Sequence, residues 1–160
     1  MILLLLACLP EDVALDDSVP VLDDTAAAST EPLYGQWISD GADISPLFSG
    51  APFEYLSIDA VFGDEGYEVV GHTADDDYTF AGTFTIDTSS TPASIELIQT
   101  QPGNAVARGI YLVEDEVLTY EVVQVEPDYG YAPPTPEEGF GSTTGPNLSE
   151  GDNVQVYRRP

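Results

Sequence analysis

Residues 78–87 read YTFAGTFTID, and they predict the fold class more clearly than any other part of the chain. The apolar side chains of Phe80, Phe84 and Ile86 alternate with threonines, which places them on one face of an extended strand and the hydroxyls on the other. The turn-forming sequence TSSTP follows, and then ASIELIQT at 93–100 alternates again. The two segments predict an antiparallel hairpin.

The same pattern of short strands and tight turns continues on both sides of this hairpin. GDEG at 63–66 indicates a hairpin turn, and a short helix is expected at 43–48. Sequential strands joined by tight turns favour a meander, and eight strands suffice to close one into a small barrel. We therefore predict an all-β fold, an antiparallel up-and-down barrel of about eight strands. The six further strands are expected at 34–39, 53–62, 67–73, 106–114, 117–125 and 153–159.

One long segment, residues 126–152, does not follow this pattern. It holds five prolines and several glycines, and connections of this length are usually either functional or disordered. Tyr129, Tyr131 and Phe140 provide apolar anchors, so we expect the loop to pack partly across one end of the barrel. The alternative is an unpacked insertion.

The charge balance is strongly acidic, with 29 Asp and Glu residues against three basic residues and a formal net charge of −26. Such a surface repels nucleic acid phosphates, which excludes a nucleic-acid-binding protein. Concentrated salt screens dense carboxylates, so the favoured interpretation is a saline habitat. The alternative is a specific cationic partner such as calcium.

The first eight residues, MILLLLAC, indicate an export signal and not part of the folded domain. LLAC resembles a bacterial lipobox, so residues 1–8 are interpreted as a lipoprotein signal stub whose Cys8 carries lipid and anchors the chain to the membrane. Residues 9–31 are acidic and lack a sustained period, as expected of a disordered tether. The folded domain is expected at 32–160. We predict an exported protein, lipid-anchored to the bacterial cell envelope on the outer membrane or periplasmic face; the alternative is a cytosolic protein with an apolar start.

The order of segments carries a family resemblance. LYGQW, FAGTFTID, ARGIYLVEDEVLTYEVV and, after the Pro-rich loop, VQVYRR follow one another across residues 33–159. This series resembles the lipocalin-like small-domain family common in Planctomycetes and other environmental bacteria, although the chain lacks the lysines usual in that family. The resemblance implies a lipocalin-like barrel with a structural latch, in which Gly35 and Trp37 at the start meet Arg158 or Arg159 at the end. The alternative is that both arginines are solvated.

Signals for catalysis or metal binding are weak. His72 is the only histidine and no nucleophile elbow lies near it, so a surface histidine is expected. One histidine and one distant cysteine do not make a zinc site. The acidic clusters at 64–65 and 75–77 lack the alternating spacing of an EF-hand loop. We expect no enzymatic activity, no cofactor and no metal.

The barrel interior is the remaining candidate site, because eight strands enclose a lumen that is either packed solid or holds one small ligand. The short strands favour a packed core. The favoured function is therefore a structural or protein-interaction module with an envelope protein partner, and the alternative is a carrier or sensor of a small apolar ligand. The candidate core or ligand-lining residues are Phe80, Phe84, Ile86, Ile95, Leu97, Ile110, Leu112, Leu118 and Tyr120.

Overall fold

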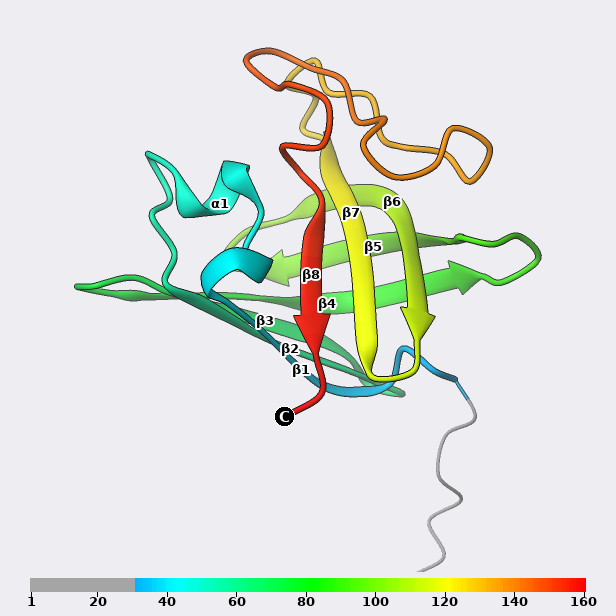
Figure 1. Cartoon of the computed structure of the whole chain (residues 1–160), viewed down its shortest axis with the longest axis horizontal. Coiled ribbons are helices and arrows are strands. Elements are labelled where there is room, and N and C mark those ends of the chain that lie inside the picture. Colours follow the sequence, from blue (N-terminus) through cyan, green and yellow to red (C-terminus); the bar gives the residue numbers. More distant parts are fainter. Residues whose placement is uncertain (1–30) are drawn as a thin grey trace, which may run out of the picture.

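The computed structural model describes residues 31–160 and shows eight strands in chain order (Figure 1). Each strand pairs antiparallel with the next, and β1 also pairs with β8 through Ile38 and Arg158, so the sheet closes into a barrel. The all-β, antiparallel up-and-down barrel expected from the sequence is confirmed. The strands are β1 Gly35–Asp40, β2 Ser57–Gly63, β3 Gly66–His72, β4 Asp77–Asp87, β5 Ala93–Gln101, β6 Ala105–Glu114, β7 Val117–Glu126 and β8 Gln155–Arg158.

Two short helices connect β1 to β2, close to where one was expected. The 3-10 helix η1 spans Gly41–Asp43, and α1 spans Pro46–Ser49 with the proline at its first turn, where its fixed φ suits a helix start. Gly50 ends α1 and donates its N–H to the Pro46 carbonyl, 3.1 Å away.

Residues 53–56 differ from the prediction, which placed them in a strand. β2 begins only at Ser57, because Glu54 has a φ of +52°, a left-handed conformation that interrupts an extended chain. The N–H of Tyr55 instead donates to the carbonyl of Phe48 at 2.9 Å. This segment therefore folds back against α1 and contributes its side chains to one end of the barrel.

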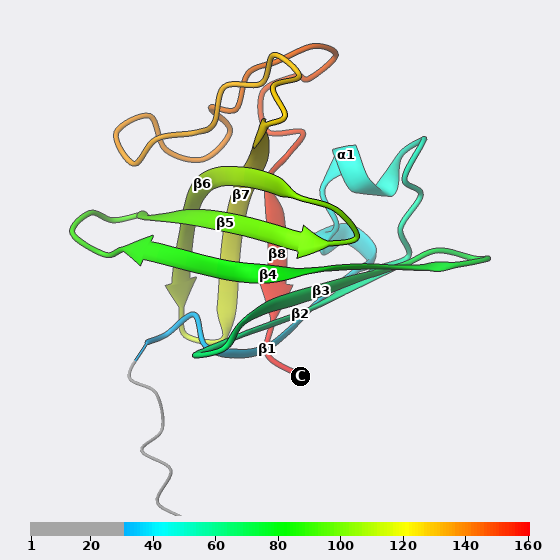
Figure 2. The same ribbon diagram turned by 180° about the vertical axis from the view of Figure 1, so that it is seen from behind.

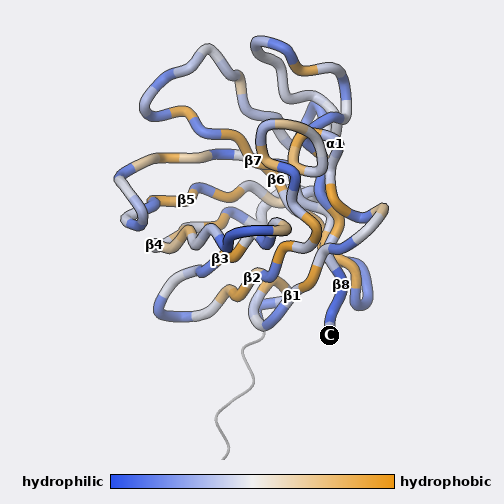
Figure 3. Tube along the Cα trace, turned by 90° about the vertical axis from the view of Figure 1, so that its left-hand side faces the viewer, coloured by the Kyte–Doolittle hydropathy of each residue, from blue (hydrophilic) through white to orange (hydrophobic). Residues whose placement is uncertain are grey.

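Alternation along the strands separates the interior from the surface, as hydropathy mapped on the chain shows (Figure 3). On β4 the expected two faces are confirmed, since Phe80, Phe84 and Ile86 are half-buried while the intervening Thr83 and Thr85 are exposed. This is the period of two that a strand imposes on its side chains.

The latch between the first and last strands is formed by Arg159, not by Arg158. The Arg159 guanidinium lies 3.8 Å from the centre of the Trp37 ring and donates to the carbonyls of Tyr34 and Pro32, each at 2.8 Å. Trp37 is fully buried. At Gly35, φ is +117° and a side chain would run into this guanidinium, so the position requires glycine.

Arg158 lies apart from this latch. Its guanidinium forms an exposed ion pair with Asp43, with an Nε to Oδ2 distance of 2.7 Å. The two arginines therefore hold different elements: Arg159 joins the strands, and Arg158 fixes η1 to β8.

The long loop, residues 127–154, lies with α1 at one end of the barrel, whereas the β6–β7 turn and the C-terminus lie at the other (Figures 1 and 2). Glu121, fully buried on the outer face of β7, accepts hydrogen bonds from the N–H groups of Gly141 at 2.5 Å and Thr143 at 2.9 Å. The loop is therefore packed, and it covers the side of β7 as well as the barrel end where packing was expected.

Candidate functional site

The barrel interior is hollow toward one end. A cavity of about 610 Å³ opens at the end that carries α1 and the long loop. This finding differs from the solid core that the short strands favoured. The lining residues are Leu47, Phe48, Phe53, Tyr55, Ile58, Tyr67, Val69, Gly71, Phe80, Leu97, Gln99, Ala105, Ala107, Tyr120, Val122, Val123, Gln124, Tyr129, Tyr131, Leu148, Asn153 and Tyr157.

The chemistry of this lining is aromatic and uncharged. Nine of the described residues that line it are Phe or Tyr, and none is Asp, Glu, Arg or His. A chain with a net charge of −26 thus keeps its charges away from the lumen. Clefts of this size and composition are typical of sites for small apolar molecules.

Phe62 separates the cavity from the filled half of the barrel. Its ring lies 6.3 Å from Tyr67 in a stacked arrangement, 6.2 Å from Tyr120 and 5.5 Å edge-on from Phe84, measured between ring centres. Tyr67 and Tyr120 line the cavity, whereas Phe84 packs against the core on the other side. Phe62 therefore lies in the core directly behind the lining residues Tyr67 and Tyr120.

One side of the mouth is an aromatic cluster from the α1–β2 connection. Ring centres lie 5.5 Å apart for Phe48 and Phe53 and 5.9 Å apart for Phe53 and Tyr55. Tyr55 continues the cluster outward to Tyr78, at 6.1 Å. Tyr55 packs directly on Gly71 of β3, where an added Cβ would lie 2.7 Å from its ring. Glycine at this position therefore permits the cluster to sit over the mouth.

The long loop forms the other side of the mouth. Tyr129, Tyr131 and Leu148 line the cavity from this loop, as the apolar anchors in its sequence suggested. The two sides are joined, because the N–H of Leu47 donates to the carbonyl of Asp152 at 2.9 Å. The mouth is thus bounded by two connected segments that are distant in sequence.

The amide side chains in the lining donate hydrogen bonds to backbone carbonyls. The amide nitrogens of Gln99, Gln124 and Asn153 donate to the carbonyls of Gly103, Pro127 and Val122 at 3.0, 3.2 and 2.9 Å. Asn153 and Gln124 thereby tie both ends of the long loop to β7.

Three tyrosines that line the cavity have raised pKa values. Burial raises the pKa of Tyr67 to about 12, and burial also raises the pKa of Tyr157 and that of Tyr120 well above their usual range. The Tyr157 and Tyr67 phenols raise the pKa of Tyr120 further. All three remain neutral hydrogen-bond donors at physiological pH.

Seven of the nine candidate residues lie inside the barrel, but they divide between its two halves. Phe80, Leu97 and Tyr120 line the cavity. The remaining four belong to the filled core or pack against it: Phe84, Ile86, Ile95 and Leu118.

Ile110 and Leu112 differ from the other seven. Ile110 pairs with Glu121, whose side chain lies on the outer face, while the neighbouring Tyr111 pairs with Tyr120 inside. The period of two therefore places Ile110 and Leu112 outside the lumen. Ile110 is nonetheless fully buried.

Tyr67, Val69 and Tyr157 line the cavity although they were not among the candidates. The signal that could have identified them is the same alternation, which runs through GYEVVGH in β3 and QVYR in β8.

His72 lies outside the cavity in a cross-strand cluster. Its Nδ1 is 2.7 Å from an Asp77 oxygen and its Nε2 is 3.1 Å from an Asp59 oxygen, so it bridges β2 and β4. The hydrogen bond to Asp77 has the largest effect and raises the pKa of His72. Burial opposes it by a smaller amount, and the hydrogen bond to Asp59 raises the pKa further, so the net shift is upward. Within residues 31–160, no group of three or more His, Cys, Asp or Glu side chains is arranged to hold a metal ion.

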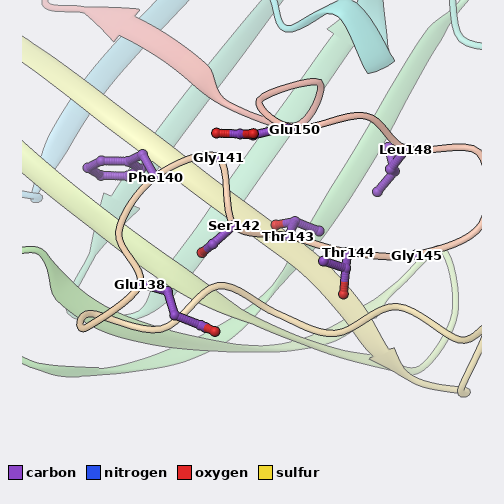
Figure 4. Close-up of a pocket in the computed structure, with 9 residues that line it drawn as sticks. All are labelled: Glu138, Phe140, Gly141, Ser142, Thr143, Thr144, Gly145, Leu148 and Glu150. Carbon is purple, nitrogen blue, oxygen red and sulfur yellow. The ribbon is translucent and has the colours of Figure 1, made fainter.

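A second hollow of about 430 Å³ lies within the long loop itself (Figure 4). Its lining comes from residues 138–150 alone, with Glu138, Ser142 and Glu150 beside Phe140 and Leu148. Unlike the lumen, it mixes charged and apolar side chains on a single segment.

No protein-family model matches the chain, and comparisons with curated proteins and with solved structures found no match either. The family resemblance of the segments therefore stays a prediction. Cys8 lies outside the described residues, so its lipidation stays a prediction too. No helix in the described part of the chain is both long and apolar enough to cross a membrane.

Proposed function

We propose that this protein binds a small apolar molecule in its barrel and acts as a non-enzymatic carrier or sensor. The observation that supports this most is the aromatic, uncharged cavity of about 610 Å³ with an open mouth. Ligand sites typically enclose ~300–1,000 Å³ and bury most of the ligand surface. A purely structural head has no need of such a hollow, which forfeits packing contacts along its walls.

A protein-interaction module is the second candidate, and exposed apolar side chains around the mouth favour it. Leu56 and Tyr129 are 62% and 61% exposed, and Phe53 and Tyr78 are also exposed. Apolar groups gathered on an acidic surface are typical of contact sites. A partner docked there would cover the mouth, so the two functions are compatible.

Attachment to the cell envelope through a lipid on Cys8 is proposed from residues 1–8 alone. Growth of the producing bacterium with an alkyne-labelled fatty acid should label the chain, and Cys8→Ser should abolish the label while leaving the barrel folded. Equal labelling of the Cys8→Ser chain would remove this part of the proposal.

The binding function is tested with the full chain and the neutral fluorescent probe N-phenyl-1-naphthylamine. Its emission should increase on titration and saturate at one site per chain. Ala107 lines the cavity, so Ala107→Phe should fill the lumen and suppress binding. Ala81, in a strand position between the inward Phe80 and Gly82, provides the matched control, since Ala81→Phe adds the same ring to the outer face.

Val69→Phe is a second filling variant, for use if Ala107→Phe does not fold. Absence of saturable binding to the unmodified chain, or equal binding by filled and control variants, would refute a lumenal site.

A further inference from the structure

Three tyrosines from three strands line the cavity, two of them buried and the third, Tyr120, partly buried. Tyr67 of β3 and Tyr157 of β8 are 6% and 5% exposed, and both line the lumen with Tyr120 of β7. The rings of Tyr120 and Tyr157 meet edge-on with centres 6.2 Å apart, and the centre of the Phe62 ring lies 6.3 Å from that of Tyr67 and 6.2 Å from that of Tyr120. The three phenols thus form one compact cluster.

The hydroxyls of this cluster have no hydrogen-bond partner among residues 31–160, as the hydrogen bonds of those residues show. Within residues 31–160 the solvent-inaccessible side-chain atoms that lack a partner are Ser45 Oγ and Thr143 Oγ1, so the three tyrosine hydroxyls are open to the lumen. A tyrosine hydroxyl in an otherwise apolar site normally takes a hydrogen-bond partner. Tyr111, buried in the filled half of the same barrel, follows that rule and donates to Glu31 at 3.0 Å. The contrast indicates that the three lumenal hydroxyls are left for a ligand.

No cation is placed to receive a negatively charged ligand. Each of the three arginines is engaged outside the lumen: Arg108 with Glu96 at 2.7 Å, Arg158 with Asp43, and Arg159 with Trp37. A carboxylate that entered the cavity would lose its hydration without gaining a counter-charge, which is strongly unfavourable. A cation would likewise find no carboxylate among the lining residues, so an uncharged ligand is favoured.

The phenols also determine which polar group the ligand brings. They supply donors, and a carbonyl oxygen has two lone pairs that accept from two of them at once. A phenol oxygen can also accept, but a carbonyl oxygen uses two of these donors without bringing a further donor of its own. Aromatic walls favour a flat ring system, because rings stack edge-on or offset against them.

We propose that the lumen selects an uncharged, ring-containing carbonyl compound, a ketone or quinone, whose oxygen accepts hydrogen bonds from two hydroxyls of the cluster formed by Tyr120, Tyr157 and Tyr67. This inference rests on the proposed function and names the class of ligand that the same cavity takes. It assigns the three tyrosines to specificity, whereas the surrounding apolar side chains provide general affinity.

Three probes of one shape separate the contributions. 2-Acetylnaphthalene carries the carbonyl, 2-isopropenylnaphthalene replaces its oxygen with carbon, and 2-naphthoate carries a negative charge. Their dissociation constants are measured by equilibrium dialysis against the full chain and against Tyr120→Phe/Tyr157→Phe, which removes two oxygens and no internal hydrogen bond. Tyr111→Phe is the matched control, because it makes the same change away from the cavity.

In the double variant, the dissociation constant of the ketone should rise by about two- to tenfold, the range of a net hydrogen bond, while that of the alkene should not rise. Tyr111→Phe should change neither, and 2-naphthoate should not bind. Unchanged ketone affinity, parallel weakening of ketone and alkene, or binding of the naphthoate would each overturn the carbonyl inference while leaving lumenal binding intact. Failure of all three probes to bind would count against the proposed function itself.

Discussion

The guanidinium of Arg159 lies 3.8 Å above the ring of Trp37, and this contact joins the last strand of the barrel to the first. The neighbouring Arg158 is the last residue of β8, and it points instead to Asp43. Arg159 continues the chain past the strand end, where its N–H donates to the Glu116 carbonyl at 3.1 Å, and adjacent residues of an extended chain face opposite sides. The two adjacent arginines therefore stabilise different contacts, and replacing each one alone measures its contribution to stability.

Arg159→Gln should lower the free energy of unfolding by about 1–3 kcal/mol, since it removes a stacked cation and two backbone hydrogen bonds. Arg158→Gln, which breaks only an exposed ion pair, should cost about 0–1 kcal/mol. Urea denaturation at one salt concentration measures both. Equal losses would contradict the assignment of the latch to Arg159.

Glu121→Gln should release the long loop from the side of β7. The substitution replaces one of the two accepting carboxylate oxygens with an NH2 group, which cannot accept a hydrogen bond. One of the two buried N–H groups is then left unsatisfied, at a cost of about 1–3 kcal/mol. Limited proteolysis followed by mass spectrometry should show faster cleavage within residues 127–154. Glu114→Gln, at an exposed position of β6, is the control and should leave the cleavage pattern unchanged.

His72 should make stability dependent on pH above the usual histidine pKa of 6.5. Because the folded-state pKa is raised by Asp77 and Asp59, the protonated bridge contributes its full stabilisation below that value. The contribution is lost as pH rises through the folded-state pKa. The melting temperature of the unmodified chain should therefore fall toward that of His72→Gln as pH increases, whereas a constant difference between them would refute the bridge.

Gly71→Ala should disturb the mouth of the cavity. The added methyl would lie 2.7 Å from the ring of Tyr55, so the ring must tilt, and overpacking of this kind costs about 1–3 kcal/mol. The affinity for N-phenyl-1-naphthylamine should fall. Gly63→Ala is the matched control, since nothing lies within 4 Å of its new methyl group, and it should bind the probe as before.

The sequence predicted the barrel well because alternation and turn residues are local signals. They located all eight strands within a few residues, apart from residues 53–56, where a left-handed Glu54 turns the chain. Alternation also identified Phe80 and Tyr120 as inward. It mis-assigned Ile110 and Leu112, because a continuous apolar run such as GIYLV does not show which residues share a face.

The hollow itself could not be predicted from the pattern. Alternation says which side chains face inward, but whether facing side chains meet depends on the barrel diameter and on the tilt of the strands. The phenol cluster of Tyr67, Tyr120 and Tyr157 comes from three different strands. The separation of these residues along the sequence does not predict that their side chains meet. Long-range closure of the sheet creates this site.

Glu31, where the described chain begins, is bonded to Tyr111 at the filled pole of the barrel, while the mouth opens at the other pole. A chain immobilised at Glu31 on a sensor surface should therefore present its mouth to the flowing solution. The same polarity holds for any surface that holds the barrel at Glu31: a molecule that enters the lumen would come from the medium, not from the supporting layer beneath.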